Sequence, residues 1–229
     1  MLTVDSLSSG YGLSPIIHDC SFGVKPQEVL GVMGRNGMGK TTLFKTLMGM
    51  LPTWSGEVSI NDQSLDKRKP HERVASGIAY VPQGRHVFPT LTVEENILAG
   101  LEVTGRREVP EDIYSLFPVL LEMRKRRAGN LSGGQQQQLA IARALAANPK
   151  VLLLDEPTEG IQPSIIKEMA SSLKEIRDIR GVSILFSEQV LSFSMAVADR
   201  VLVIDRGYLV EEFSGSELSE ERMARHLSV

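Results

Sequence analysis

The sequence contains a single cysteine, Cys20, so it can form neither an intramolecular disulfide nor a cysteine-cluster metal site. It has no apolar run close to the roughly eighteen residues that a membrane-spanning helix needs, and its amino terminus lacks the pattern of a signal peptide. An excess of positive charge is also missing, since 25 basic residues are balanced by 28 acidic ones, which argues against a strongly cationic nucleic-acid-binding protein. We therefore expect a soluble protein of a reducing compartment that binds no nucleic acid and reaches a membrane only through another chain.

What the sequence does contain is a regular alternation of short apolar runs and helical stretches. Its 229 residues, 42% of them hydrophobic, are enough to bury a core. The run Val151–Leu154 is apolar at every position, which indicates a strand covered on both faces, as in a parallel sheet. The alternation predicts an α/β fold with a doubly wound, mostly parallel sheet. The runs that predict its strands are Val29–Met33, Ile78–Val81, Val151–Leu154, Ser183–Phe186 and Val201–Ile204.

Two parts of the chain depart from this alternation. Leu2–Leu7 and Gly56–Asp62 indicate an antiparallel β flap beside the parallel core. Residues 88–149 carry no convincing strand and begin a helix after the cap residue Thr92, so we expect an inserted α-helical lobe. Its basic run Arg124–Arg127 fits a solvated helix end better than a phosphate or lipid patch. We interpret residues 1–229 as one domain, in which 1–87 and 150–213 form the core, 88–149 the lobe, and 214–229 a polar, helical tail.

A glycine-rich loop follows the strand Val29–Met33 and precedes a helix predicted from Thr42 to Met48. Residues 34–42 match the phosphate-binding pattern G-x-x-x-x-G-K-[ST] in the strand-to-helix context that the pattern requires. Backbone N–H groups of such a loop surround phosphates, a lysine contacts the β and γ phosphates, and a threonine hydroxyl reaches Mg²⁺. The residues predicted to bind the nucleotide here are Gly34, Asn36, Gly37, Gly39, Lys40, Thr41 and Thr42.

Two adjacent carboxylates, Asp155 and Glu156, follow the most apolar strand. They lie at its carboxyl end, which is where open α/β sheets bind ligands. Because side chains alternate along a strand, the two carboxylates should point differently and have different tasks. We expect Asp155 to hold Mg²⁺ through its water shell and Glu156 to orient or deprotonate the attacking water.

A second glycine turn, Leu131–Gln135, stands twenty residues before this pair. Ser132 is a good N-cap for a helix predicted from Gln135 to Ala147, and the start of that helix can bind an anion. The first loop already covers the phosphates of one nucleotide. We therefore expect Ser132, Gly133, Gly134 and Gln135 to contact the γ-phosphate of a nucleotide held by another copy or a homologous chain.

Leu131–Gln135 matches the signature sequence of the ATP-binding cassette ATPases, and with the phosphate loop and Val151–Glu156 it resembles that family along nearly the whole chain. The resemblance implies a P-loop NTPase core, with ATP and Mg²⁺ bound. It also implies that Tyr11 stacks on adenine. Gln83 takes the place of the family's glutamine that contacts Mg²⁺, acts in catalysis and links the core to the lobe.

The chain departs from the family pattern at two positions. Gln189 stands where the family usually has a histidine; it can hydrogen-bond a γ-phosphate or a water but cannot carry a proton near neutral pH. Gln162 replaces a common aspartate, so contacts between subunits there must differ in charge. Glu188-Gln189 is similar to the importers of branched-chain amino acids and of urea or short-chain amides. Gln83 and its neighbours resemble the urea branch more, since the amino-acid branch tends to carry a glutamate there.

The resemblance implies an ATPase subunit of an importer, a translocase that hydrolyses ATP at a head-to-tail dimer interface, most similar to the urea branch. The implied partners are a second, related ATPase subunit in a heterodimer, two membrane permeases and, indirectly, an external solute-binding protein. The implied place is the cytoplasmic face of the inner membrane. Three alternatives stay open: a branched-chain amino acid importer ATPase, a cassette ATPase without permeases such as an assembly factor, and a nucleotide-binding regulator without turnover.

Overall fold

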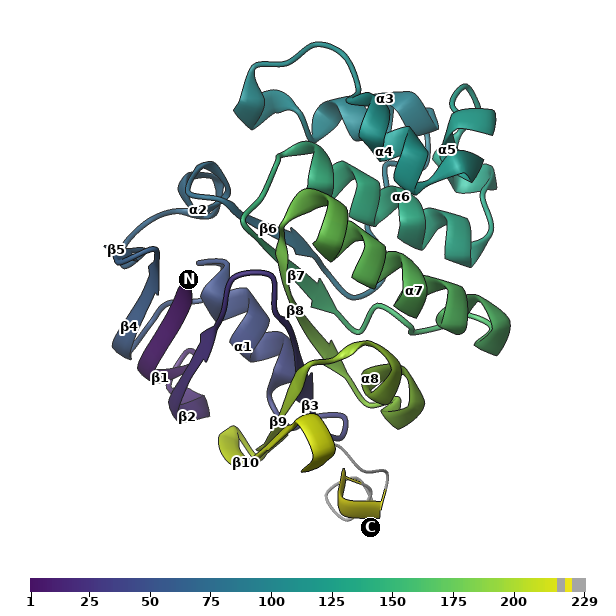
Figure 1. Ribbon diagram of the computed structural model, residues 1–229. Helices are drawn as coiled ribbons and strands as arrows, with labels where there is room; N and C mark the ends of the chain where they lie inside the picture. Colours follow the sequence, from purple (N-terminus) through teal and green to yellow (C-terminus); the bar gives the residue numbers. More distant parts are fainter. Residues whose placement is uncertain (218–220, 224–229) are drawn as a thin grey trace.

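The computed structural model describes residues 1–217 and 221–223, which form two sheets and the helices around them (Figure 1). In the larger sheet, β10 is antiparallel to β9 and every other pair of neighbours is parallel. This confirms the predicted mixed, mostly parallel sheet, and all five predicted strands lie in it. Its strands, in order, are β10 (Tyr208–Ser214), β9 (Arg200–Asp205), β3 (Val29–Met33), β8 (Ser183–Glu188), β7 (Val151–Asp155) and β6 (Ile78–Val81).

The smaller sheet is antiparallel and forms the predicted flap. Its strands, in order, are β2 (Ser14–Val24), β1 (Leu2–Tyr11), β4 (Ser55–Ile60) and β5 (Gln63–Ser64). The sequence pattern does not predict β2, because its apolar residues do not alternate regularly: Ile16 and Ile17 are adjacent. The pairing of β2 with β1 explains this, since its register shifts at three points, and each shift moves side chains to the other face.

The two faces of the larger sheet are covered by different layers. Val151 and Leu153 of β7 pack in the core cluster shared with α1 (Lys40–Leu47) and the antiparallel sheet. Leu152 and Leu154 pack on the opposite face, in the cluster formed with the lobe helices, α7 (Pro163–Arg180) and α8 (Leu191–Val197). The helix α1 therefore lies between the two sheets (Figure 1). Burial on both faces is the reason why β7 is apolar throughout.

Residues 88–149, which we call the helical lobe, contain helices and turns, as predicted. Thr92 caps the first of them: its Oγ1 accepts the N–H of Glu95 at 3.2 Å, and Glu95 Oε2 accepts the N–H of Thr92 at 2.7 Å. The basic run at Arg124 to Arg127 is exposed in the turn after α5. The lobe helices are α3 (Val93–Ala99), α4 (Glu111–Leu116), α5 (Pro118–Glu122) and α6 (Gly133–Ala146), with 3₁₀ turns at Glu102–Thr104 and Ala128–Asn130. In Figure 1 they gather above the core.

Two remaining segments complete the described chain. The helix α2 (Pro70–Ala75) connects β5 to β6, and Gly215–Glu217 form a 3₁₀ turn after β10. The predicted helical tail, 214–229, lies partly outside the described residues. Every helix in the described ranges is too short or too polar to cross a bilayer.

Candidate functional site

The loop between β3 and α1 has the backbone conformation that its glycines predict. Gly37 has φ +82° and Gly39 has φ +106°, in the left-handed region that side chains rarely adopt. A Cβ at Gly39 would also lie 2.9 Å from Ile17 Cδ1. The loop opens onto a cavity of about 210 Å³. Its lining residues are Ile16, Gly37, Gly39, Lys40, Thr41, Thr42 and Glu156.

Lys40 is almost completely buried beneath this loop. Its ammonium donates to the carbonyls of Gly34 at 2.7 Å and Arg35 at 3.1 Å, both in the loop itself. It also lies 3.1 Å from Glu156 Oε1, and the two side chains are 3% and 8% exposed. The positive charge is therefore held at the floor of the cavity, where the attraction for phosphate oxygens is screened little by water.

Asp155 is buried at the end of β7 and accepts hydrogen bonds from three different elements. Its Oδ1 accepts from Thr41 Oγ1 at 3.3 Å and from Ser187 Oγ at 2.6 Å, and its Oδ2 accepts from Tyr80 at 3.1 Å. Burial, together with the neighbouring charge of Asp155, raises the pKa of Tyr80 far above its ordinary value, so the phenol stays protonated and can donate. The carboxylate is thus fixed in orientation beside the hydroxyl of Thr41.

Glu156 reaches the same cavity because the chain changes direction directly after Asp155. Glu156 has φ +47°, and its N–H donates to the carbonyl and the hydroxyl of Ser187. Its Oε2 accepts from Gln83 Nε2 at 3.2 Å, while Oε1 faces Lys40. The two carboxylates therefore contact different partners, as the alternation argument predicts, but both face the phosphate loop because the strand ends at Asp155.

The second glycine turn is not part of this cavity. Ser132 Oγ accepts the N–H of Gln135 at 3.3 Å and Gln135 Oε1 accepts the N–H of Ser132 at 3.0 Å, so the predicted cap forms at the start of α6. Ser132 is exposed, and Gly133 and Gly134 are partly exposed. Neither they nor Gln135 line the phosphate-loop cavity of the same chain. The turn is therefore exposed on the surface, apart from the phosphate-loop cavity of its own chain.

Three other predicted residues lie at the edges of the site. Tyr11 is 46% exposed at the end of β1, and Asn36 is exposed in the phosphate loop. Gln189 is exposed after β8, and its N–H donates to Glu188 Oε2 at 3.0 Å. These placements leave Tyr11 and Gln189 accessible to a bound molecule and do not test their predicted roles.

Three residues that the sequence pattern does not predict as part of the site form hydrogen bonds in and beside it. Tyr80 and Ser187 orient Asp155, and Glu188, 1% exposed, accepts the N–H and hydroxyl of Thr158 at 3.0 and 2.5 Å. Tyr80 could have been noticed as a phenol inside a predicted strand, since a buried tyrosine hydroxyl usually needs a partner. Ser187 and Glu188 carried no such signal, because their partners come from β7 and the loop after it.

The oxygen atoms around Asp155 suit Mg²⁺ rather than a transition metal. Within the described ranges there is no cluster of three or more histidine, cysteine, aspartate or glutamate side chains that could hold a metal. Mg²⁺ does not need one, because it is usually bound by one or two carboxylates, water and substrate phosphates. Asp155 and the Thr41 hydroxyl provide hard oxygen donors of this kind.

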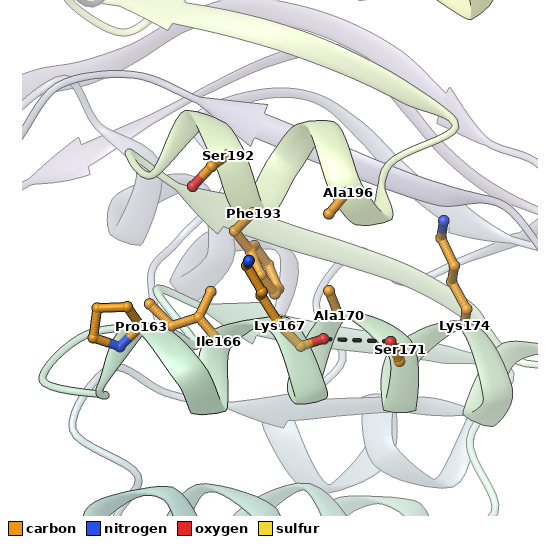
Figure 2. Close-up of a pocket in the computed structure, with 9 residues that line it drawn as sticks. All are labelled: Pro163, Ile166, Lys167, Ala170, Ser171, Lys174, Ser192, Phe193 and Ala196. Atoms are coloured by element: carbon orange, nitrogen blue, oxygen red, sulfur yellow. Dashed lines mark hydrogen bonds between the residues drawn. The ribbon is translucent and has the colours of Figure 1, made fainter.

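A larger groove lies elsewhere and differs in chemistry. Figure 2 shows it between α7 and α8. Its volume is about 430 Å³. Phe193, Ile166 and Ala170 contribute apolar surface, and Lys167 and Lys174 are exposed beside it. No residue that lines the phosphate-loop cavity lines this groove. The groove is therefore separate from the cavity that the phosphate loop lines.

Comparison with known proteins places this arrangement in a family. A family model described as ABC transporter matches residues 17–159. The chain is 38% identical to the high-affinity branched-chain amino acid transport ATP-binding protein BraG of Pseudomonas aeruginosa, over 95% of this chain and 94% of that protein. It is 35% identical to the probable branched-chain amino acid transport ATP-binding protein LivF of Archaeoglobus fulgidus, over 96% and 94%. It is also 30% identical to the lipopolysaccharide export system ATP-binding protein LptB of Escherichia coli, over 99% and 95%.

Solved structures of ATP-binding cassettes share the fold of this chain. A nucleotide-free ATP-binding cassette from an ABC transporter superposes with a TM-score of 0.85 at 25% identity, covering 99% of this chain and 94% of that one. The ADP conformation of an ATP-binding cassette superposes with a TM-score of 0.80 at 26% identity, covering 95% and 92%.

Proposed function

The chain belongs to the family of ABC transporter ATPases, and from this premise we propose that it powers the import of branched-chain amino acids through a membrane complex. Two observations support the proposal. The cluster of Lys40, Glu156 and Gln83 has the groups that ATP hydrolysis requires. The relatives BraG and LivF are named for branched-chain amino acid transport and match along almost the whole chain.

In the proposed reaction, each side chain of the site has one task. Backbone N–H groups of the phosphate loop and the Lys40 ammonium bind the β and γ phosphates. A water molecule attacks the γ-phosphorus, the bond to the β–γ bridging oxygen breaks, and ADP leaves with that electron pair. Glu156 accepts the proton of the water, and Gln83 holds the Glu156 carboxylate through its other oxygen. Tyr11 offers its exposed ring to the adenine.

Mg²⁺ is part of the same proposal. We assign its protein ligands to Thr41 Oγ1, Asp155 and Gln83, directly or through water. When bound there, Mg²⁺ would supply the positive charge that offsets the charge developing on the phosphate oxygens. Tyr80 and Ser187 keep the Asp155 carboxylate oriented toward Thr41, as the hydrogen-bonded neighbours of metal ligands generally do.

In this proposal, a second subunit completes the binding site for the γ-phosphate. The start of α6 exposes Ser132 and leaves the backbone of Gly133 and Gly134 partly exposed, away from the chain's own phosphate loop. A head-to-tail dimer brings this turn to the nucleotide of the partner, where the helix N-terminus attracts the anion. Gln189 is accessible for a contact with the same phosphate or with water. We propose that the partner is a related but different ATPase subunit, so that the dimer is a heterodimer.

A groove between the core and the helical lobe is suited to a permease. Its volume is about 370 Å³, and Val74, Phe88 and Val103 line it. The ring of Phe88, 47% exposed, lies 4.9 Å below the guanidinium of Arg143. Arg143 Nη1 is buried and lacks a hydrogen-bond partner among the described residues. We propose that an amphipathic helix of the permease fills this groove and presents an acceptor to Arg143, which holds the chain at the cytoplasmic face of the membrane.

The solute follows from the relatives rather than from the site, which contains no residue that would contact it. The residues around Gln83 resemble the urea branch, but the relatives BraG and LivF are named for branched-chain amino acid transport. The LptB relatives are named for lipopolysaccharide export and are less similar, at 30% identity. We therefore propose branched-chain amino acid import and retain urea as the competing solute. An external binding protein would deliver the solute to two permeases.

Uptake in cells that lack this chain tests the proposal. Entry of labelled leucine should fall to the background level, return with the wild-type chain, and stay low with Glu156→Gln. Entry of labelled urea should not change. A loss of urea uptake with normal leucine uptake would show that the solute is wrong while the ATPase assignment stands. Co-purification of permeases from detergent-solubilised membranes excludes an assembly factor without permeases, and their absence would contradict import.

A further inference from the structure

Arg85 lies at a point where three segments of the protein meet. It follows Gln83 by two residues in the loop that leaves β6. Its Nη2 donates to the carbonyl of Glu159 at 2.9 Å and to that of Gly160 at 3.2 Å. These two carbonyls belong to the loop that leaves the carboxylate strand β7. One side chain therefore joins the loop of Gln83 to the loop that follows Glu156.

The same guanidinium packs against the start of α6 in the helical lobe. A Cβ placed on Gly133 would lie 3.1 Å from Nη1, 3.2 Å from Nη2 and 3.3 Å from Cζ of Arg85. These three similar distances mean that the flat guanidinium faces the Gly133 backbone directly. Arg85 thus contacts the core loop and the lobe helix at once, and it can do so because position 133 has no side chain.

The backbone around Arg85 is in a conformation that needs support. Gly84, Arg85 and His86 have φ values of +83°, +68° and +48°, a region that residues other than glycine adopt only at an energetic cost. The loop is held at its far end by Arg143 of α6, whose Nη2 donates to the carbonyl of His86 at 2.8 Å. Contacts from both the core and the lobe therefore fix the loop that carries Gln83.

We propose that Arg85 is a positioning residue that couples the start of α6 to the catalytic carboxylate. It fastens the Gln83 loop to Glu159 and Gly160, so that the Gln83 amide stays 3.2 Å from Glu156 when the lobe occupies the position described here. A rotation of α6 moves Gly133 relative to the guanidinium. Because Arg85 joins the Gln83 loop to the loop of Glu159 and Gly160, the two loops then shift together. The placement of the Ser132–Gln135 turn then controls whether Glu156 is oriented for hydrolysis. This inference rests on the proposed ATPase cycle and adds to it a residue outside the known motifs.

The test is the steady-state ATPase activity of Arg85→Gly, with and without guanidinium ion. Glycine suits the left-handed backbone of position 85, so the variant removes the side chain without adding strain. We expect kcat to fall about 10- to 100-fold, as for a small misplacement of catalytic groups, with KM for ATP changed less than about twofold. Guanidinium at a low millimolar concentration, well below the denaturing range, should restore part of kcat.

Two further variants make the result specific. Arg85→Lys should remain impaired, since one ammonium does not reproduce a planar group that bonds two carbonyls and packs flat on Gly133. Arg124→Gly, at an exposed arginine of the lobe, should behave as the wild type and should not respond to guanidinium. The coupling role would be overturned if Arg85→Gly had the kcat of the wild type or changed only in KM. It would also be overturned if guanidinium did not restore any of the lost kcat. A wild-type chain without ATPase activity would instead overturn the proposed function.

Discussion

Lys40 and Glu156 form a buried ion pair, with Nζ 3.1 Å from Oε1. The two residues come from different motifs, 116 positions apart in the sequence. Phosphate oxygens and the Glu156 carboxylate attract the same ammonium. In the proposed reaction, binding of a nucleotide has to replace part of this pair, which would leave the carboxylate free to accept a proton from water.

Glu156→Gln should stop ATP turnover without weakening ATP binding. The amide cannot accept the proton of the water, so kcat should fall by at least about 100-fold, while Lys40 loses a competing anion. Calorimetry should give an affinity for ATP equal to or higher than that of the wild type. Lys40→Ala is the contrasting variant, in which binding itself is lost. Unchanged hydrolysis in Glu156→Gln would remove this residue from the mechanism.

Ser132→Arg should block ATP-driven association while sparing ATP binding by the single chain. The arginine adds bulk at the exposed start of α6, where the partner's nucleotide is proposed to lie, and Ser132 does not line the chain's own cavity. Light scattering measures the association, in the presence of the partner subunit if one is required. Ser115→Arg, on the exposed face of α4 in the same lobe, is the control and should associate normally. Association of both variants would refute the trans site.

Tyr80→Phe should raise the Mg²⁺ concentration needed for half-maximal ATPase activity by about tenfold. The phenol donates to Asp155 at 3.1 Å, and loss of a hydrogen bond that orients a metal ligand weakens metal affinity by this order. Tyr114→Phe is a matched control, because the Tyr114 hydroxyl is buried with no hydrogen-bond partner in the described part of the chain. It should leave the Mg²⁺ dependence unchanged. Equal Mg²⁺ curves for all three proteins would contradict the positioning role of Tyr80.

Glu28→Gln should destabilise the fold near neutral pH and lose this effect in acid. Burial alone would raise the pKa of Glu28, but hydrogen bonds from Arg200 and the Lys25 backbone hold the pKa below its ordinary value of 4.5. The ionised pair therefore contributes stability above that value, and the contribution disappears as the pH falls through the lowered pKa. We expect a loss of about 2 kcal/mol near neutral pH.

Urea denaturation at neutral and at acid pH measures this difference. The gap between the wild type and Glu28→Gln should narrow as the pH falls through the lowered pKa of Glu28 and close below that pKa, where the wild-type carboxyl is protonated as well. Glu122→Gln, at an exposed glutamate of α5, should show no gap at either pH. A gap that is independent of pH would mean that the ionised carboxylate is not the source of the stability.

The parallel strands and the phosphate loop could be predicted because their signals are local. An apolar run of four residues specifies β7, and the loop motif contains its own glycines, lysine and threonine. The strand β2 was missed because register shifts against β1 break its alternation. Tyr80, Ser187 and Glu188 were missed because their partners lie on other strands, so nothing beside them in the sequence indicates the contact. The contacts of Arg85 could not be predicted either, because Glu159, Gly160 and Gly133 are distant from it in the sequence.

The sequence by itself determined the family, the phosphate-binding loop and the identity of the two carboxylates, since these depend on residue type and spacing along the chain. Only the tertiary structure decided that Glu156 turns back toward Lys40, that Asp155 is held by three hydroxyl groups from α1, β6 and β8, and that the Ser132 turn lies outside its own chain's cavity. The physical reason is that these features depend on how the strands are ordered and on backbone angles at single residues. Both are fixed by packing between segments that are distant in the sequence.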